Sequence, residues 1–329
     1  MKNVYIIFKD TYLNETSVVG GEDESKYYGN YFDYVFLDEF YDNNHEQNET
    51  QILKTCLGIL FKKSNNYHPC IIFGGDLTNQ IFISSMVAKE IDSSFVGIYS
   101  ACSSLILSMI LGSVFVSNKI VENSLCFTSS SFNTAERQFR YPLEYGGQKK
   151  YQTTITTTGA SACYISNSKS LIKINSSTIG KIEDVDWKDS SDLGSPMSYA
   201  AFSSIKAHLE NSNRSYDDYD AIITGDLSYL GSKILKDLFK YEGINLTNHF
   251  DCGENIFSKD KKFFCGGSGS ACIGLLSFSY IKKMMEKGIY NRVLLVGTGS
   301  LHSKTSSEQN ENVPIVAHVI ELEKVNDLS

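Results

Sequence analysis

The sequence SACSSLILSMILG, residues 100–112, decides the fold of this chain. Residues 95–99 before it predict a short apolar strand, and residues 105–111 predict a helix that is apolar on nearly every side and therefore buried. Between them lies a turn of small residues with Cys102 at its centre. A cysteine there would meet the unpaired N–H groups and the positive end of the helix dipole, which favours a reactive thiolate or a bound anion. Packing alone would also explain a small buried residue at this position.

The arrangement around this stretch recurs in the second half of the chain. The shared letters are GDL at residues 75–77 and 225–227, and SAC at residues 100–102 and 270–272. The predicted strands and helices around them follow in the same order in both halves. Two motifs that recur in one order predict a duplicated α/β unit, with halves at residues 1–170 and 171–329. The two apolar helices are then expected to pack back to back.

Composition and charge exclude several classes of function. The formal net charge of -8 and the absence of basic blocks argue against nucleic acid as a partner, because phosphate neutralisation supplies most non-specific affinity. The eight cysteines contain no CxxC pair and no histidine is spaced to complete a zinc set, so we expect reduced thiols, no metal and no cofactor. Neither a signal peptide nor an apolar run of about 18 residues is predicted, so we expect a protein made in the cytoplasm. Residues 10–45 are polar and predict surface structure.

A long connection at residues 129–157 is the part least like the repeat, and such loops on an α/β frame usually cap a site or an interface. Within it, Arg137 and Arg140 could each hold a carboxylate in a hydrogen-bonded fork, or could pair with neighbouring glutamates to hold the loop. Asp76 and Asp226 follow equivalent strands, where ligands bind in α/β sheets and where aspartate also caps helices.

A cysteine enzyme would need a base close to Cys102. Of the six histidines, His249 in an insertion and His302 after a predicted strand are the two that could reach a pocket. The residues alone therefore leave an enzyme and a binding protein open.

The duplicated halves, with a cysteine at the head of the first central helix, resemble the thiolase fold. That resemblance implies a five-layered αβαβα architecture and a homodimer. Within this fold, the string NTAERQFRYP at residues 133–142, followed by EYGGQK at 144–149, is similar to the family of stage V sporulation protein AD. The same family resembles this chain in GDLTNQ at residues 75–80, YDAIITGDLS at 219–228 and GGSG at 266–269.

The resemblance implies a role in spore formation. Members of that family bind dipicolinic acid (pyridine-2,6-dicarboxylate) and serve its uptake into the developing spore, together with membrane-embedded proteins of the same operon at the inner spore membrane. Phe132 and Phe250 stand where the family favours His and Asn, so we expect a less polar pocket in this chain.

Enzymes of the beta-ketoacyl synthase III type resemble the chain in the cysteine turn, so Cys102 aligns with their nucleophile. Their histidine aligns with the Gly225-Asp226 step and their asparagine with Gly267, and glycine can neither orient a thiolate nor polarise a carbonyl. We therefore expect a non-catalytic binding protein. The expected ligand contacts are Cys102, Ser103, Arg137 or Arg140, Asp226, Gly267 and Ser268. The alternative is an acyltransferase in which Cys102 works with His249 or His302.

Overall fold

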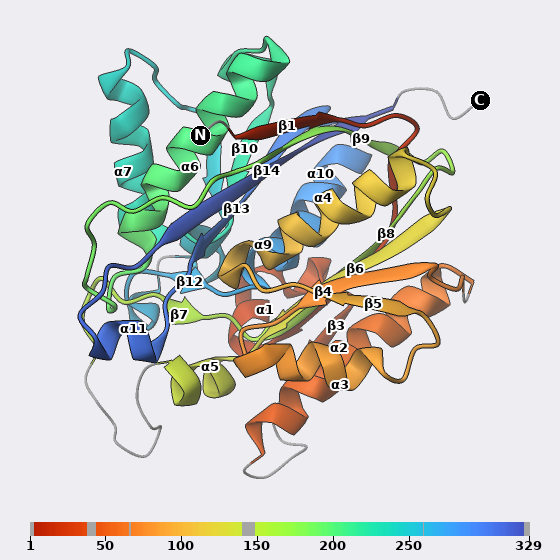
Figure 1. Ribbon diagram of the computed structural model, residues 1–329, viewed down its shortest axis with the longest axis horizontal. Helices are drawn as coiled ribbons and strands as arrows, with labels where there is room; N and C mark the ends of the chain where they lie inside the picture. The colour runs from red at the N-terminus through yellow and green to blue at the C-terminus, as the bar shows by residue number, and fades with distance from the viewer. Residues whose placement is uncertain (1–2, 38–43, 66, 140–148, 259, 326–329) are drawn as a thin grey trace.

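The computed structural model describes residues 3–37, 44–65, 67–139, 149–258 and 260–325. The strands are β1 (Val4–Ile7), β2 (Tyr12–Gly21), β3 (Tyr34–Phe36), β4 (Ile71–Gly75), β5 (Ser94–Gly97), β6 (Asn123–Ser130), β7 (Ile155–Thr156), β8 (Gly159–Ser166), β9 (Ile172–Ile179), β10 (Ala221–Thr224), β11 (His249–Asp251), β12 (Gly267–Ser268), β13 (Arg292–Ser300) and β14 (Ile315–Lys324). The α-helices are α1 (Glu22–Tyr28), α2 (His45–Lys63), α3 (Phe82–Ala88), α4 (Ser104–Ser117), α5 (Phe132–Phe139), α6 (Gly194–Ser212), α7 (Ser228–Tyr241), α8 (Cys252–Ile256), α9 (Cys272–Leu276), α10 (Lys282–Glu286) and α11 (Lys304–Glu308). Figure 1 shows their arrangement.

The strand order confirms the predicted duplication. The main path of hydrogen-bonded strands runs β11-β10-β13-β14-β9-β2-β8-β6-β4-β5. From the centre outward, one half contributes β2, β8, β6, β4 and β5, and the other contributes β9, β14, β13, β10 and β11. The two halves meet where β2 pairs with β9, with Leu13 opposite Ile172. The repeat seen in the letters GDL and SAC is therefore a repeat of topology, and the strands of both halves form one continuous sheet.

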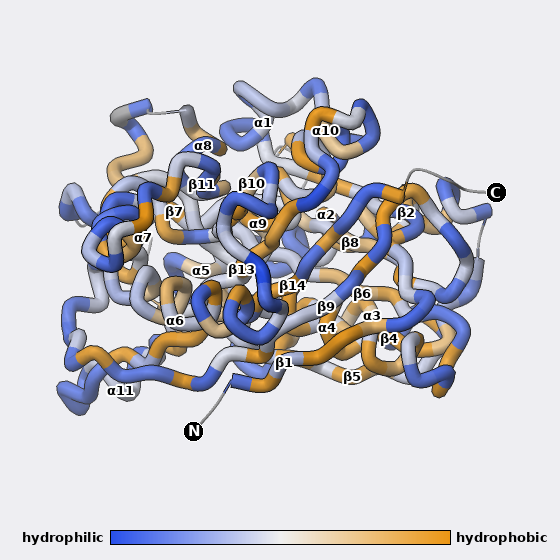
Figure 2. The backbone as a smooth tube through the Cα atoms, turned by 90° about the horizontal axis from the view of Figure 1, so that it is seen from above, coloured by the Kyte–Doolittle hydropathy of each residue, from blue (hydrophilic) through white to orange (hydrophobic). Residues whose placement is uncertain are grey.

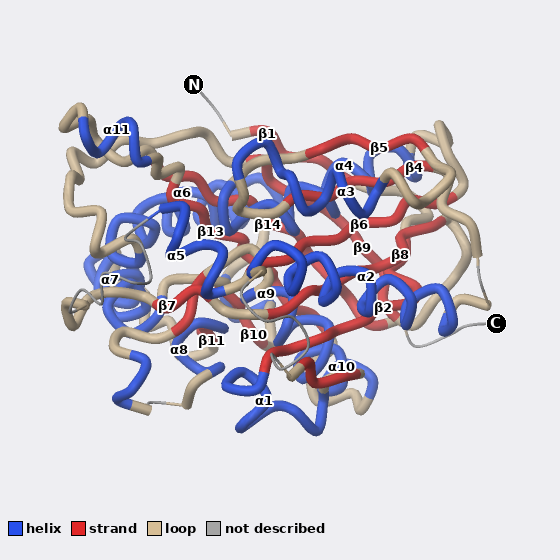
Figure 3. The backbone as a smooth tube through the Cα atoms, turned by 90° about the horizontal axis from the view of Figure 1, so that it is seen from below, coloured by secondary structure: helices blue, strands red, loops and turns tan. Residues whose placement is uncertain are grey.

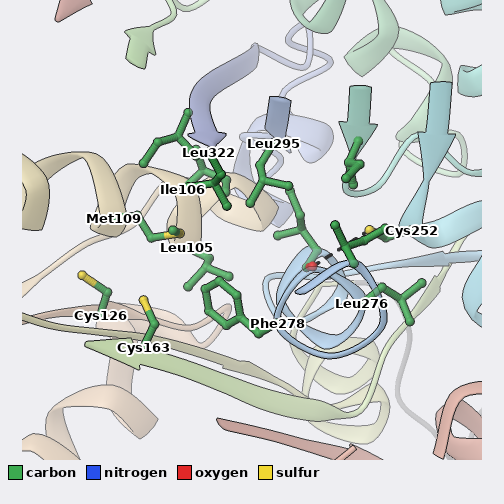
Figure 4. Packing of buried hydrophobic residues seen from close by; sticks show 14 of the residues in the cluster. Leu105, Ile106, Met109, Cys126, Cys163, Cys252, Leu276, Phe278, Leu295 and Leu322 are labelled. Atoms are coloured by element: carbon green, nitrogen blue, oxygen red, sulfur yellow. Dashed lines mark hydrogen bonds between the residues drawn. The ribbon is translucent and has the colours of Figure 1, made fainter. Parts of the chain in front are cut away.

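Three hydrophobic clusters build the predicted layers. Helices α2 and α3 cover one outer face, α6 and α7 cover the other, and α4 and α9 lie between the half-sheets (Figure 1). Neighbouring residues on a strand face opposite layers, since Ile72 joins the α2 cluster while Phe73 joins the central one. Figure 4 shows the central cluster, in which Leu105 and Met109 of α4 are fully buried. Each such side chain contributes about 1.5–3 kcal/mol to stability.

Helix α9 packs very closely against its surroundings. A Cβ atom on Gly274 would lie 1.9 Å from Ser161 Oγ on β8 and 2.8 Å from Leu105 on α4, so only glycine fits there. Figure 2 shows the hydrophobic residues gathered in the central strands and in α9, with hydrophilic residues on the outer loops. None of the described helices is both long enough and apolar enough to cross a membrane.

Two expectations about burial were wrong. Residues 10–45 do not all lie on the surface, because β2 is a largely buried central strand whose small side chains let α9 approach. Helix α4 is not buried on every side, since Leu107, Leu111 and Val114 are only partly covered. They repeat at helical spacing and form an apolar stripe that this chain alone leaves half-exposed.

Candidate functional site

The turn at Cys102 is held by its own hydroxyl groups. Ser103 Oγ donates to the backbone oxygen of Ser100 at 2.6 Å, and Ser104 Oγ donates to that of Ala101 at 2.7 Å. Ala101 has a φ of 48°, a left-handed conformation that costs a non-glycine residue about 1 kcal/mol. His318 Nε2 supports the turn from β14, 3.2 Å from Ser100 Oγ, and burial lowers the pKa of this histidine to about 4. Ser103 therefore builds the turn, and it does not line the cavity described next.

Cys102 opens into a small cavity where the two halves meet. We call it the Cys102 cavity; it has a volume of about 50 Å³ and a mixed lining of hydroxyl, aromatic and imidazole groups. Its principal lining residues are Tyr99, Cys102, Phe139, Thr156, Ser268 and His302. In Figure 1, α5 and β7 lie beside each other at this end of the molecule. The volume holds a few water molecules, so a larger ligand would have to extend beyond it.

Ser268 reaches this cavity because two glycines shape its loop. Gly266 and Gly269 have φ values of +117° and +119°, which side-chain-bearing residues rarely adopt. Between them, β12 pairs in parallel with β7, and Ser268 Oγ donates to Thr154 Oγ1 at 2.9 Å. The predicted meeting of Cys102 and Ser268 is thus found in the structure.

The two positions that align with catalytic partners are tightly packed glycines. A Cβ atom on Gly225 would lie 3.0 Å from Ile273, and one on Gly267 would lie 2.8 Å from Ile256 and 3.0 Å from Thr157. Gly267 itself does not line the Cys102 cavity, contrary to expectation. A histidine or an asparagine at these places would require the surrounding core to shift.

Arg137 is not in the Cys102 cavity. It forms an ion pair with Glu46 of α2, and its side chain is half-exposed. The alternative in which Arg137 pairs with a glutamate is therefore found. The glutamate lies on α2, however, and is not one of the neighbouring glutamates of the loop. Arg140 falls outside the described residues. Of the two arginines, Arg137 is therefore not the one that could hold a carboxylate at Cys102, and the expectation for Arg140 stays a prediction.

The two candidate histidines have different surroundings. His302 lies after β13, lines the Cys102 cavity and is 3.2 Å from Ser307 Oγ through Nδ1. His249 lies on β11, with Nε2 2.8 Å from Thr224 Oγ1, and it is not among the residues that line that cavity. Burial, with the charge of Lys236, lowers the pKa of His249 to about 3. Only His302 is therefore placed to act with Cys102.

Asp226 is a buried structural carboxyl group rather than a cavity residue. Burial and the neighbouring Asp251 raise the pKa of Asp226 well above its usual value. The Gly269 amide favours the ionised form weakly, but no described group meets hydrogen-bond geometry with either carboxyl oxygen. Asp251 accepts hydrogen bonds from the Thr224 hydroxyl and from the Ser228 amide, among others, and burial still raises its pKa to about 7.

Asp76, the equivalent residue of the first half, stabilises the start of α3. Its carboxylate accepts from the amide and hydroxyl groups of Thr78 and Ser84, which confirms the helix-capping interpretation. The sequence reasoning missed Tyr99, Phe139 and Thr156 as lining residues. The position of Tyr99, directly before the cysteine turn, could have indicated that it lines the cavity. Phe139 and Thr156 are brought to the cavity by α5 and β7, and no local pattern indicates this.

Among the described residues, no cluster of His, Cys, Asp or Glu side chains could hold a metal ion.

The fold and the cysteine turn define a thiolase-fold protein. The chain is similar to solved structures of OleA from Xanthomonas campestris. A cerulenin-bound form is 13% identical with a TM-score of 0.61, covering 96% of this chain and 98% of that one. A form with bound lauric acid and lauroyl-CoA is also 13% identical with a TM-score of 0.61, covering 95% and 100%. At this identity the likeness concerns the fold alone.

Within that class, the chain belongs to the family of stage V sporulation protein AD. The sequence model of this family matches residues 2–323. Stage V sporulation protein AD of Bacillus subtilis (strain 168) is 37% identical over 334 residues, which span 100% of this chain and 98% of that protein. The family and fold indicated by the sequence motifs are confirmed, and they give the chain a role in sporulation.

Proposed function

We propose that this chain binds dipicolinic acid without transforming it and serves its uptake into the developing spore. The observation that carries the proposal is a cavity kept at Cys102 while tightly packed glycines, Gly225 and Gly267, stand where the catalytic partners align. The hydroxyl groups of Thr156 and Ser268 and the imidazole of His302 offer polar contacts to a carboxylate there. Membrane-embedded partners of the same operon would bring the protein to the inner spore membrane.

Calorimetric titration with dipicolinate tests this proposal. We expect saturable heat for one ligand per chain, with a dissociation constant below about 1 mM. Pyridine-3,5-dicarboxylate is the matched control, because it has the same charge and size but places its carboxylates differently. No saturable heat at millimolar dipicolinate, or equal affinity for both isomers, would refute the function.

Acyl transfer through Cys102 is the second candidate function. The observation in its favour is that His302 lines the same cavity as Cys102, so a base is present. Against it stands the loss of both aligned partners, since catalytic residues of this kind act as a unit and removing them costs several orders of magnitude in rate.

We further propose that the protein is a homodimer. Strand β5 is the end strand of the path and has one pairing partner, β4, among the described strands. Val96 and Tyr99, on and just after β5, are 38% and 47% exposed. The half-exposed stripe on α4, which includes Leu107 and Leu111, belongs to the helix that follows β5 in the chain. A second copy pairing edge to edge through β5 would cover the strand and extend the sheet.

A further inference from the structure

A larger pocket adjoins the Cys102 cavity and shares Thr156 with it. We call it the Phe132 pocket; its volume of about 480 Å³ lies in the range of small-molecule sites, whereas the Cys102 cavity, at about 50 Å³, is too small for a whole ring. Five phenylalanine rings line it, together with two lysines and the three acidic residues Glu22, Asp23 and Glu24. The lining residues that matter here are Phe36, Phe132, Phe257, Phe263, Phe264 and Lys149. Figure 3 shows α5 and β7, which carry part of this wall, near one another.

The phenylalanine rings of this pocket suit a flat ring, and its lysines, which stand against three carboxyl groups of the lining, are the groups that could bind a negative charge on that ring. Aromatic walls favour stacking or edge contacts with another ring. Lys149 Nζ lies 5.2 Å from the centre of the Phe132 ring, and its side chain is 21% exposed. The second lining lysine, Lys262, is 68% exposed and lies 3.3 Å from a carboxylate oxygen of Asp23. Lys149 is thus the more enclosed cation of the two.

We infer that the Phe132 pocket binds the ring of the aromatic dicarboxylate and that Lys149 binds one of its carboxylates. This inference rests on the proposed function and assigns its ligand to specific residues. The second carboxylate is directed past Thr156 towards the Cys102 cavity. Lys149 then takes the role that the sequence suggested for Arg137 or Arg140; the structure pairs Arg137 with Glu46, and Arg140 lies outside the described residues.

Because Lys149 has an ion-pair partner, the inference predicts opposite changes in ligand affinity for substitutions of the two residues. Lys149 forms an ion pair with Glu136 of α5, whose side chain is 4% exposed. An entering carboxylate competes with Glu136 for the same ammonium group. Removing the charge of Glu136 should therefore strengthen ligand binding, whereas removing the charge of Lys149 should weaken it. A purely structural ion pair would predict the same direction for both substitutions.

Calorimetry with dipicolinate on three variants tests the assignment. We expect Lys149→Gln to bind at least about tenfold more weakly and Glu136→Gln to bind a few-fold more tightly than the wild type. Lys150→Gln is the matched control, because Lys150 is 61% exposed and faces Asp189 instead of the pocket. It should bind like the wild type. Lys149→Arg keeps the charge and should restore binding to within a few-fold.

The outcomes separate this inference from the function on which it rests. If the wild type binds dipicolinate and Lys149→Gln binds within twofold of it, the site assignment is wrong and the function stands. The same conclusion follows if Glu136→Gln and Lys149→Gln weaken binding equally. If Lys149→Gln does not fold, weak binding by a folded Lys149→Arg variant overturns the assignment. A wild type that does not bind refutes both.

Discussion

Replacing Glu321 by glutamine is expected to lower the free energy of unfolding by about 3 kcal/mol. Glu321 lies on β14, and its side chain is 2% exposed. It is the acceptor at the centre of a buried polar network that joins strands β9, β13 and β14 of the second half to α6. Its partners are Asn175, His208, Arg214, Tyr219 and Arg292, with the Tyr219 hydroxyl donating at 2.9 Å. Glutamine keeps the shape but leaves the two guanidinium groups without their shared charge.

Glu323→Gln is the matched control for this substitution. Glu323 lies two residues further along the same strand and also contacts Asn175 and Arg292, but its side chain is 34% exposed. Because solvent screens that pair, we expect a loss below about 1 kcal/mol. Denaturant titration of both variants measures the difference. Equal losses for Glu321→Gln and Glu323→Gln would contradict the account of a buried network.

The same network predicts how stability depends on pH. Burial alone would raise the pKa of Glu321, but the nearby imidazole of His208, hydrogen bonds from Asn175 and Tyr219 and the charge of Arg214 outweigh it and lower the pKa to about 2. A depressed carboxyl pKa means that the folded state binds the proton less readily than the unfolded state. The contribution of Glu321 is therefore complete above about pH 5 and is lost as the pH falls through 4 towards 2. Glu321→Gln should flatten this part of the profile.

Val96→Lys is expected to convert the proposed homodimer into a monomer. Lysine on an edge strand opposes edge-to-edge pairing, because pairing would remove its ammonium group from water without a partner. We expect dimerisation to weaken by about 100-fold or more, which light scattering after gel filtration would detect as a halved mass. The matched control is Ile7→Lys, since Ile7 is 69% exposed on β1, another peripheral strand. A wild type that is monomeric, or a Val96→Lys variant that remains dimeric, would contradict this interface.

The sequence predicted the architecture because the duplication left matching letters in both halves. The GDL motifs and the cysteine turns mark equivalent strand ends, so one repeat located most of the sheet. It did not predict β2 and β9, which lie where the halves join. Their polar and small residues look like surface structure, yet both strands are largely buried where the two halves join.

The candidate site was predicted only in part, for a similar reason. Cys102 belongs to the repeated turn, and Ser268 was expected near it because the family motif GGSG directly precedes the second turn. The position of the Arg137 side chain is set by its ion pair with Glu46, which is 91 residues away in the sequence. No local sequence pattern indicates such a contact. Lys149 lies at the end of a loop motif that was recognised as a string, but its place beside Phe132 follows from the fold of α5.

The central claim is that this chain keeps a ligand pocket at Cys102 but does not carry out the acyl transfer of the enzymes with which Cys102 aligns. Intact-protein mass spectrometry tests both halves of that claim on one sample. In native spectra with dipicolinate, we predict one ligand per chain that is lost on denaturation. After exposure to an acyl-CoA, we predict an unchanged denatured mass. A stable acyl adduct on the wild type that is absent from Cys102→Ala would contradict the account.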